Sequence, residues 1–296
     1  MTAADATDDP FVVHRGLLFT VAYELLGSAA DAEDVLQESW LRWAAVDRAA
    51  VGDPRAYLVR IVTRQSLNQL RTLSRRREDY VGEWLPEPLL TSPDVADDVE
   101  LAESLSMATL TVLETLGPSE RAVFVLREVF DVPYDEIAEA VGKSTAAVRQ
   151  IAHRAKEHVA ARRPRVTVDR EEHLEVVERF VAAFNSGDLQ GLMDVLAPDV
   201  VSVADSGGKV PGAARRPIEG ATRLIAYLQG GMAKFGLVPT ASVVWVNGHP
   251  AMRVEIDGSL AGIVNLVVED GRVTRIFNIA NPDKLGFVTD EAPLAR

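Results

Sequence analysis

Apolar residues between positions 132 and 163 recur at a helical spacing and predict two short helices joined by a tight turn. The first helix begins at Pro133, which suits a first helical position because its missing N–H is not needed there. Gly142 ends that helix and supplies the positive-φ turn, and Ser144 caps the next one. The apolar residues that the two helices bury are Ile137, Ala138, Val141, Val148, Ile151, Ala152 and Ala155.

The second of these helices keeps polar side chains on its outer face. A helix-turn-helix presents such residues to major-groove base edges, which Arg and Gln read with bidentate geometry. A solvated amphipathic hairpin would show the same pattern. DNA is favoured because seven cations stand against Glu157 alone between Lys143 and Arg165, in a chain of net charge −13. The candidate base-reading residues are Ser144, Thr145, Arg149, Gln150, His153 and Arg154.

Two further helices are predicted near the N-terminus. The first covers Phe11 to Leu26, and Gly27 and Ser28 separate it from a helix that buries one apolar face with two tryptophans. Acidic residues early in that second helix suit the helix dipole, and its polar face is equally able to dock on a basic helix of a partner. Its candidate docking residues are Asp31, Asp34, Gln37, Glu38 and Trp40.

A third helix opens at Pro54 and contains no acidic residue as far as Arg77, whereas seven arginines and several amides lie along it. Such a helix is either a solvated charged face or a nucleic-acid surface. The second interpretation is favoured because Arg neutralises phosphates while Asn and Gln read bases. The candidate nucleic-acid residues are Arg60, Arg64, Gln65, Asn68, Arg71, Arg75 and Arg76.

Residues 79–100 change character, since they combine acidic residues with prolines and cannot form one helix. Trp84 and Leu85 stand beside Pro86 and are expected either to find an apolar seat or to pack against their own helical domain. A helix from Leu101 to Leu116 and another starting at Pro118 then complete a second helical domain with the helix-turn-helix.

Beyond Pro164 the hydrophobic period shifts from helical to alternating. Helices are predicted over 173–185, 189–196 and 222–235, and strands near 200–203, 242–246, 251–256, 261–268 and 272–278. Turn signals such as Asn247-Gly248 join the strands, and a glycine-rich, basic loop runs from Asp205 to Arg216. This order of elements predicts an α+β cone, with a curved antiparallel sheet enclosing a pocket.

Composition restricts the remaining possibilities. The 296 residues are 47% hydrophobic and contain no cysteine, which excludes disulfides and cysteine metal sites. The start of the chain is acidic and polar, unlike a signal peptide, and no apolar run approaches the roughly 18 residues of a membrane helix. We therefore expect a soluble cytoplasmic protein that does not bind a membrane, a metal or a cofactor.

The order of an acidic-faced helix, an Arg-rich helix, an acidic linker and a helix-turn-helix resembles the extracytoplasmic-function sigma factors of bacterial RNA polymerase. The resemblance implies that the helix with Asp31 binds the β′ clamp helices of core polymerase, and it includes the β flap among the core contacts. It also implies that the Arg-rich helix captures the −10 promoter element and that the helix-turn-helix reads the −35 element. The implied domains are region 2 over 10–78, the linker over 79–100 and region 4 over 101–165.

The C-terminal part, over 170–290, resembles SnoaL-like domains, and three short motifs resemble those of sigma factors that carry such a domain. Ser206 departs from the glycine more common there. The resemblance implies two all-α domains followed by a SnoaL-like cone that regulates activity within the chain. It also implies that no dedicated anti-sigma factor is needed. The residues of the three motifs are Trp84, Leu85, Pro86, Asp205, Lys209, Asn281, Pro282, Asp283, Lys284 and Leu285.

Enzymes with SnoaL-like domains place Asp, Arg or His around the pocket, so catalysis was weighed for this domain. We expect none: His249 lies in a turn and is expected at the surface, and Asp205 follows a strand, where a turn aspartate is common and where it could pair with Lys209 across the loop. An unidentified small ligand in the pocket remains open. The alternatives are a ligand-sensing transcription factor that works without polymerase, and a SnoaL-like enzyme. The candidate pocket residues are Asp199, Asp205, Lys209, His249, Arg253 and Asn265.

Overall fold

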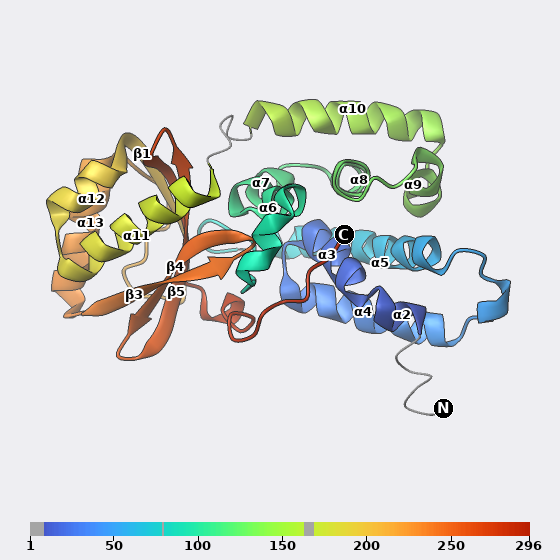
Figure 1. The fold of residues 1–296 in the computed structure, drawn as a ribbon, viewed down its shortest axis with the longest axis horizontal. Coiled ribbons are helices and arrows are strands. Elements are labelled where there is room, and N and C mark those ends of the chain that lie inside the picture. Colours follow the sequence, from blue (N-terminus) through green and yellow to red (C-terminus); the bar gives the residue numbers. More distant parts are fainter. Residues whose placement is uncertain (1–8, 79, 163–168) are drawn as a thin grey trace.

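The computed structural model describes residues 9–78, 80–162 and 169–296. Figure 1 shows an elongated molecule, with helices at one end and a sheet covered by helices at the other. The helical end contains both predicted helical domains, and the linker runs from this end toward the sheet.

The first helical domain contains four α-helices around an apolar core. Its expected first helix is interrupted at His14, which ends one short helix and begins the next. Gly27 adopts φ 67° and Ser28 caps the following helix through Asp31 N–H, as predicted. The elements are α2 (Pro10–Val13), α3 (Arg15–Leu26), α4 (Ala29–Ala44), η1 (Arg48–Ala50) and α5 (Pro54–Glu78).

The second helical domain differs from the prediction at Ser106, whose extended backbone splits the expected helix over 101–116 into two. Ser106 also caps the second piece by accepting a hydrogen bond from Thr109 N–H. The elements are η2 (Pro93–Asp97), α6 (Val99–Leu105), α7 (Met107–Leu113), α8 (Pro118–Phe124), the π-helical turn η3 (Val125–Val129), α9 (Tyr134–Val141) and α10 (Thr145–Arg162).

The C-terminal domain has the predicted α+β order. Its six strands lie in the order β2-β1-β6-β5-β4-β3, and all neighbours are antiparallel except β1 and β6, so the sheet is mixed. The elements are α11 (Arg170–Ser186), α12 (Leu189–Val195), β1 (Leu196–Asp205), β2 (Ile218–Glu219), α13 (Ala221–Phe235), β3 (Pro239–Val246), β4 (His249–Ile256), β5 (Ser259–Glu269), β6 (Arg272–Ile279) and η4 (Pro282–Lys284).

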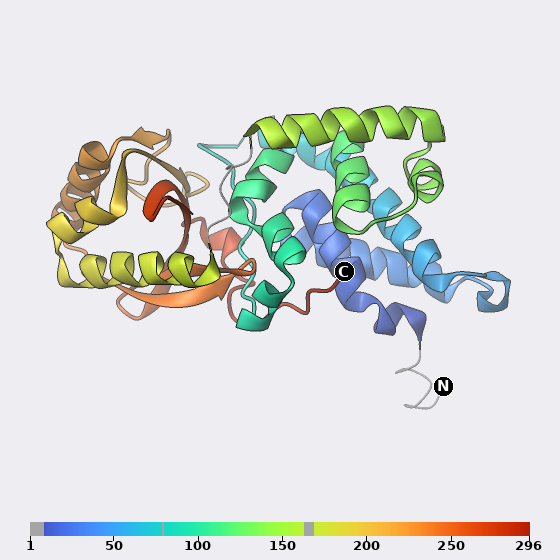
Figure 2. The same ribbon diagram turned by 45° about the horizontal axis from the view of Figure 1, so that its top comes forward.

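The two faces of this sheet have different neighbours. On one face, α11, α12 and α13 pack through Phe180, Leu192 and Leu224 against strand residues such as Leu266. The other face packs against the linker and the second helical domain, and its buried cluster includes Leu85, Met107, Phe277 and Ile279. The sheet is therefore the surface on which the helical end is docked (Figure 2).

The two helical domains share a core. Leu18 and Leu25 of α3 and Leu58 of α5 belong to the same buried cluster as Val123 and Leu126 of the second domain. Helices α5 and α9 also lie in direct contact. The chain is therefore closed, with its two predicted DNA-binding domains packed against each other.

Candidate functional site

The recognition helix α10 presents the predicted residues to solvent. Arg149, Gln150, His153 and Arg154 are exposed, and Ser144 accepts a hydrogen bond from Ala147 N–H at 3.3 Å as the helix cap. The predicted apolar stripe is buried or half-buried beneath them. The prediction was wrong in one detail, since Pro133 precedes the first helical residue instead of occupying it.

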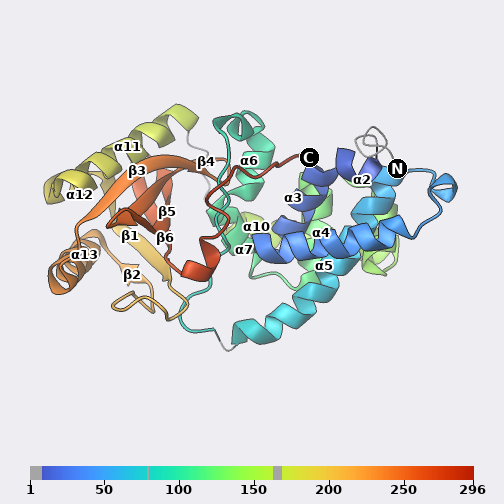
Figure 3. The same cartoon turned by 90° about the horizontal axis from the view of Figure 1, so that it is seen from below.

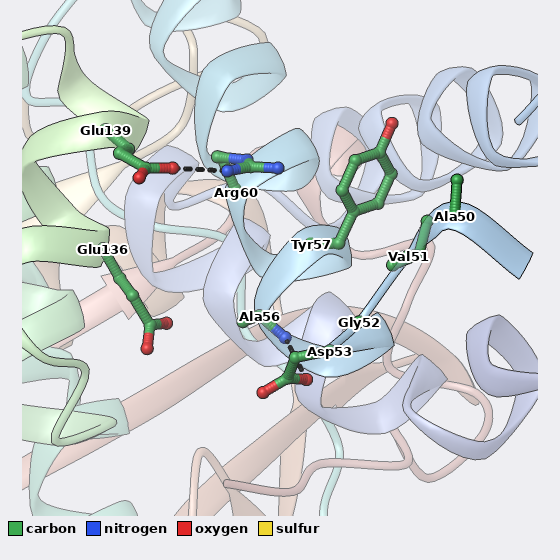
Figure 4. Close-up of a pocket in the computed structure, with 9 residues that line it drawn as sticks. All are labelled: Ala50, Val51, Gly52, Asp53, Ala56, Tyr57, Arg60, Glu136 and Glu139. Atoms are coloured by element: carbon green, nitrogen blue, oxygen red, sulfur yellow. Dashed lines mark hydrogen bonds and ion pairs between the residues drawn. The ribbon is translucent and has the colours of Figure 1, made fainter. Parts of the chain in front are cut away.

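The Arg-rich helix α5 is only partly open to solvent, because its first two candidate arginines face the second helical domain. Arg60 forms an ion pair with the carboxylate of Glu139, and Arg64 donates a 2.7 Å hydrogen bond to the Glu139 carbonyl. Figure 4 shows Arg60 and Glu139 pointing toward each other across a cleft of about 320 Å³. Its lining residues are Ala50, Val51, Gly52, Asp53, Ala56, Tyr57, Arg60, Glu136 and Glu139.

Further along α5 the candidate residues lie on a more exposed face. Asn68 and Arg71 are exposed, and the Asn68 amide oxygen accepts a hydrogen bond from Arg71 at 3.2 Å, while Gln65 is half-buried. The side chains of Arg75 and Arg76 lie outside the described part of the chain.

The predicted polymerase-docking face on α4 is open. Asp34, Gln37 and Glu38 are exposed, and Trp40 packs edge-on against Phe11 at 5.2 Å between ring centroids. A groove of about 430 Å³ runs along this face. Asp31 is less available, because its carboxylate accepts a 2.9 Å hydrogen bond from the Gln69 amide. The closed arrangement thus leaves most of this face free.

The three motifs of the linker, the β1–β2 loop and the C-terminal segment meet around the side chain of Asp205, which is fully buried. Its carboxylate accepts hydrogen bonds from the Tyr80 hydroxyl at 2.5 Å, Leu85 N–H at 2.9 Å and the Lys284 ammonium at 2.7 Å. The pairing of Asp205 with Lys209 that the sequence allowed does not form, since Asp205 pairs with Lys284 and Lys209 pairs with Asp283.

Lys284 ties the linker to this cluster, which we call the clasp (Tyr80, Trp84, Leu85, Asp205, Asn281 and Lys284). The buried ammonium of Lys284 donates a 2.5 Å hydrogen bond to the Leu85 carbonyl and lies 3.8 Å from the centroid of the Trp84 ring. Asn281 donates to the Tyr80 hydroxyl at 2.7 Å. Burial and the neighbouring Asp205 carboxylate raise the pKa of Tyr80. Of the other motif residues, Pro86 and Leu285 are buried, whereas Pro282 and Asp283 are exposed.

The linker also caps a helix of the first domain, which the sequence did not indicate. The Glu87 carboxylate accepts hydrogen bonds from the Ser28 hydroxyl at 2.9 Å and Ala29 N–H at 2.7 Å, at the N-terminus of α4. An anion there complements the helix dipole. Leu85 lies in the apolar cluster on the sheet and is only 1% exposed. Trp84 is half-buried, and a Cβ atom on Gly27 of the first helical domain would lie 3.0 Å from its ring, which agrees with the alternative that Trp84 packs against its own helical domain.

Asn247, in the β3–β4 turn, makes hydrogen bonds to three other parts of the chain. Its amide nitrogen donates to the Tyr23 hydroxyl of α3 at 2.7 Å and to the Leu105 carbonyl of α6 at 3.0 Å, and its amide oxygen accepts from Leu89 N–H of the linker at 2.9 Å. The sequence predicted the turn through Asn247-Gly248, but nothing in it indicated what lies against the turn. Gly248 is equally constrained, because a Cβ atom there would lie 2.9 Å from Ala102 Cβ.

His249 was expected at the surface, and this was wrong. It is half-buried, its ring contacts the Ala102 carbonyl at 2.9 Å, and the ring of His173 lies 5.7 Å away. Burial and His249 lower the pKa of His173 to about 4. His249 therefore contributes to the contact between the C-terminal and second helical domains, and His173 packs behind it within the C-terminal domain.

The other candidate pocket residues are dispersed. Asp199 is exposed, Arg253 forms a 2.9 Å ion pair with Glu255, and Asn265 is buried on β5. With Asp205 held in the clasp, the structure does not bring these groups together around a reacting atom.

The tail after η4 crosses both helical domains, a contact that the sequence did not predict (Figure 3). Ala292 N–H donates to the Leu90 carbonyl at 2.9 Å, and Ala295 N–H donates to the Thr20 hydroxyl of α3 at 3.1 Å. Arg296 forms a 3.0 Å ion pair with Asp98 beside α6.

In the part of the chain that is described, no helix is long and apolar enough to cross a membrane.

A buried polar group lies between the two helical domains. The Glu24 carboxyl on α3 accepts a 2.7 Å hydrogen bond from the Ser104 hydroxyl on α6, and Arg121 of α8 donates to the Glu24 carbonyl at 2.8 Å and to Glu114 at 2.5 Å. Burial raises the pKa of Glu24 to about 8, against partial opposition from Ser104 and Arg121. Burial also lowers the pKa of Arg121 to about 9, and it raises the pKa of Tyr23 nearby.

The closed arrangement should therefore weaken as pH rises. The carboxyl of Glu24 binds its proton more tightly in the closed state, because burial raises its pKa. Its contribution to the stability of the closed state is therefore complete below pH 4.5, its ordinary pKa, and is lost as the pH rises to about 8. We expect the transition in which the helical domains separate to fall in temperature between pH 6 and pH 8.5. Glu24→Gln, which stays neutral and keeps an acceptor for Ser104, should flatten this dependence. An equally steep dependence in the variant would contradict the assignment.

The sequence and the structure were compared with known proteins. Residues 11–76 match the family model for sigma-70 region 2, and residues 106–159 match that for sigma-70 region 4. The sigma factor SigJ of Mycobacterium tuberculosis is 41% identical, across 93% of this chain and 91% of that protein. A probable sigma factor of the same organism, SigI, is 31% identical across 96% and 97%. The crystal structure of M. tuberculosis SigJ superimposes with a TM-score of 0.74, covering 94% of this chain and 97% of that one.

Proposed function

Because the chain belongs to the extracytoplasmic-function sigma factors, with a C-terminal domain of the SnoaL-like fold, we propose that this domain holds the two DNA-binding domains closed until core polymerase separates them. Sigma factors are transcription initiation factors whose partners are core RNA polymerase and promoter DNA. The observation that carries the proposal is the position of Asn247, which hydrogen-bonds region 2, the linker and region 4 at once.

The DNA-reading roles follow the exposed and basic faces. In region 4, Arg149, Gln150 and Arg154 on α10 would enter the major groove of the −35 element, with His153 beside them. In region 2, α5 would bind the −10 element through Arg60, Arg64, Gln65, Asn68 and the arginines that follow. The contacts of Arg60 and Arg64 with Glu139 also support the closed-state proposal, because they occupy groups that would bind DNA.

The closed chain is incompatible with simultaneous reading of the two elements. Elements centred near −10 and −35 are separated by about 25 base pairs, or about 85 Å of duplex at 3.4 Å per base pair. In the closed chain α5 and α9 touch, and Arg60 forms an ion pair with Glu139 across their cleft. Region 2 and region 4 must therefore part before both bind one promoter.

Core polymerase is the partner we propose for opening. The α4 face with Asp34, Gln37 and Glu38 is exposed in the closed chain and would bind the β′ clamp helices first. Binding of region 4 to the β flap would then compete with its contacts to the β3–β4 turn. A ligand that binds one state better shifts the population toward it. With the restraint built into the chain, we expect no dedicated anti-sigma factor, and we assign the C-terminal domain no catalytic role.

Run-off transcription from a promoter pool with bacterial core polymerase tests this proposal. Replacing Asn247 by glycine removes the side chain but keeps the backbone unstrained, because Asn247 has φ 55°. Without that side chain, Leu89 N–H loses its acceptor and the Leu105 carbonyl loses a donor, at a cost of about 1–3 kcal/mol each in the closed state. We therefore expect at least about tenfold more transcript at limiting sigma factor, since about 1.4 kcal/mol is a factor of ten.

Asp257→Gly is the matched control. Asp257 holds the same positive-φ position, at φ 52°, in the β4–β5 turn, but it is exposed. It should leave transcription unchanged. Equal transcription from the Asn247→Gly variant and the unmodified chain would contradict closure by the C-terminal domain. Absence of core-dependent transcripts from every version, with DNA bound by the protein alone, would instead favour a regulator that works without polymerase.

A further inference from the structure

The loop between β1 and β2, residues 206–217, lies beside the start of the linker. We call it the basic loop. A Cβ atom on Gly208 would lie 2.9 Å from Val81 Cγ1, and one on Gly82 would lie 3.9 Å from Arg215 Cα. Figure 3 shows the end of α5, the linker and this loop following one another along one edge of the molecule. The basic loop is therefore a spatial continuation of the Arg-rich helix.

The basic loop is held in place by contacts that leave two of its arginines unused. Lys209 is paired with Asp283, and the Tyr227 hydroxyl both donates to the Gly212 carbonyl at 3.0 Å and accepts from Ala214 N–H at 2.9 Å. The Phe235 ring packs so closely on Gly212 that a Cβ atom there would lie 2.5 Å from it. The backbone that carries the arginines is thus fixed before any ligand arrives.

Arg215 and Arg216 are both exposed, and neither forms an ion pair with any described residue. An isolated pair of arginines is often simply solvated. Here the pair lies beside Gly82, a few residues beyond a helix that carries seven arginines and no acid from Pro54 to Arg77, so two basic segments flank the acidic Glu78, Asp79 and Glu83.

We propose that Arg215 and Arg216 bind phosphates of the promoter duplex that flanks the −10 element, which makes the C-terminal domain part of the DNA-binding surface. The inference rests on the proposed assignment of α5 to the −10 element. The clasp around Asp205 keeps the basic loop attached to the linker, and so to region 2, when region 4 moves away. Restraint and DNA binding are then functions of different parts of one domain.

The distance between the end of α5 and the basic loop agrees with a position of Arg215 and Arg216 on duplex next to the −10 element. The four Cα-to-Cα steps from Glu78 to Gly82 span at most about 14 Å. Arg215 Cα is 3.9 Å beyond the Cβ position of Gly82. With the Cα–Cβ bond of about 1.5 Å included, Arg215 Cα is within about 19 Å of the end of α5, which corresponds to about six base pairs of duplex. Contacts to phosphates carry no sequence information, so they would add affinity at any promoter that region 2 selects.

The test is the salt dependence of DNA binding by the holoenzyme. The full chain with core polymerase is titrated against a fluorescein-labelled 60-base-pair duplex of the strongest promoter in the run-off experiment. Each phosphate contact contributes about 0.9 to the slope of log K against log salt. The double variant Arg215→Ala, Arg216→Ala should lower the slope by about 1.8. Raising salt from 50 to 200 mM should then weaken the unmodified holoenzyme about 12-fold more than the variant.

Arg179→Glu is the control, because it changes the net charge by the same two units on an exposed position of α11, across the sheet from the linker. It should keep the unmodified slope. An unchanged slope in the double variant, or an equal loss in Arg179→Glu, would overturn the inference. Neither result would change the assignment of the chain as a sigma factor. That assignment fails only if the unmodified holoenzyme selects no promoter.

Discussion

Replacing Asp205 by alanine is expected to destabilise the C-terminal domain by about 3–5 kcal/mol, because it leaves a buried ammonium without its counter-charge. Asp205 is fully buried and Lys284 is 6% exposed, and their side chains are 2.7 Å apart. The Tyr80 hydroxyl and Leu85 N–H would lose their acceptor at the same time. A loss of 3 kcal/mol lowers the midpoint of thermal unfolding of the domain by about 6 °C or more.

The double variant Asp205→Ala, Lys284→Met separates the charge effect from simple loss of packing. Methionine removes the unpaired ammonium and keeps most of the side-chain length, so part of the lost stability should return. Calorimetry of the three proteins at one pH measures this. If the double variant is no more stable than Asp205→Ala, the unpaired Lys284 ammonium is not the cause of the lost stability. An unchanged midpoint of thermal unfolding in the Asp205→Ala variant would show that the clasp does not stabilise the domain.

Local signals were sufficient to predict the helix-turn-helix. Gly142 takes φ 68°, Ser144 caps α10, and Val148 and Ile151 are buried, because caps and apolar stripes depend only on residues close in sequence. The same locality explains the errors at His14 and Ser106. Each breaks a helix whose apolar period continues across the break, so the pattern showed one helix where there are two.

Partners distant in the sequence were not predictable in the same way. The sequence placed Asp205, Lys209 and Lys284 in related motifs, but local proximity suggested the wrong pair, and the true partner of Asp205 is 79 residues away. Asn247-Gly248 is a strong hairpin signal that carries no information about the surface against which the hairpin lies. The charges of α5 likewise predicted a nucleic-acid face without indicating that Glu139 covers part of it.

The contact between regions 2 and 4 explains why the closed chain should be silent. Glu136 and Glu139 from α9 face Tyr57 and Arg60 from α5 across one cleft (Figure 4). Opening the cleft must precede promoter reading, since about 85 Å separates the two DNA elements. A covalent bridge across this cleft should therefore abolish transcription while leaving the α4 face able to bind core polymerase.

The natural absence of cysteine makes this bridge specific. Gly52 and Glu136 line opposite sides of the cleft, and neither belongs to a proposed DNA-binding face. Cysteines placed at both positions can be joined by a bismaleimide that contains a cleavable disulfide. Each single-cysteine variant, treated alike, controls for modification alone. Core binding, followed by gel filtration, should be retained by the bridged chain.

Run-off transcription by this bridged chain, before and after the bridge is cleaved, tests the central claim most directly. We predict transcript below about one twentieth of the unbridged level, and recovery once the disulfide is reduced. Such recovery would show that separation of regions 2 and 4 is required for initiation. Full transcription from the bridged chain would contradict the proposal that the closed arrangement is an inactive state.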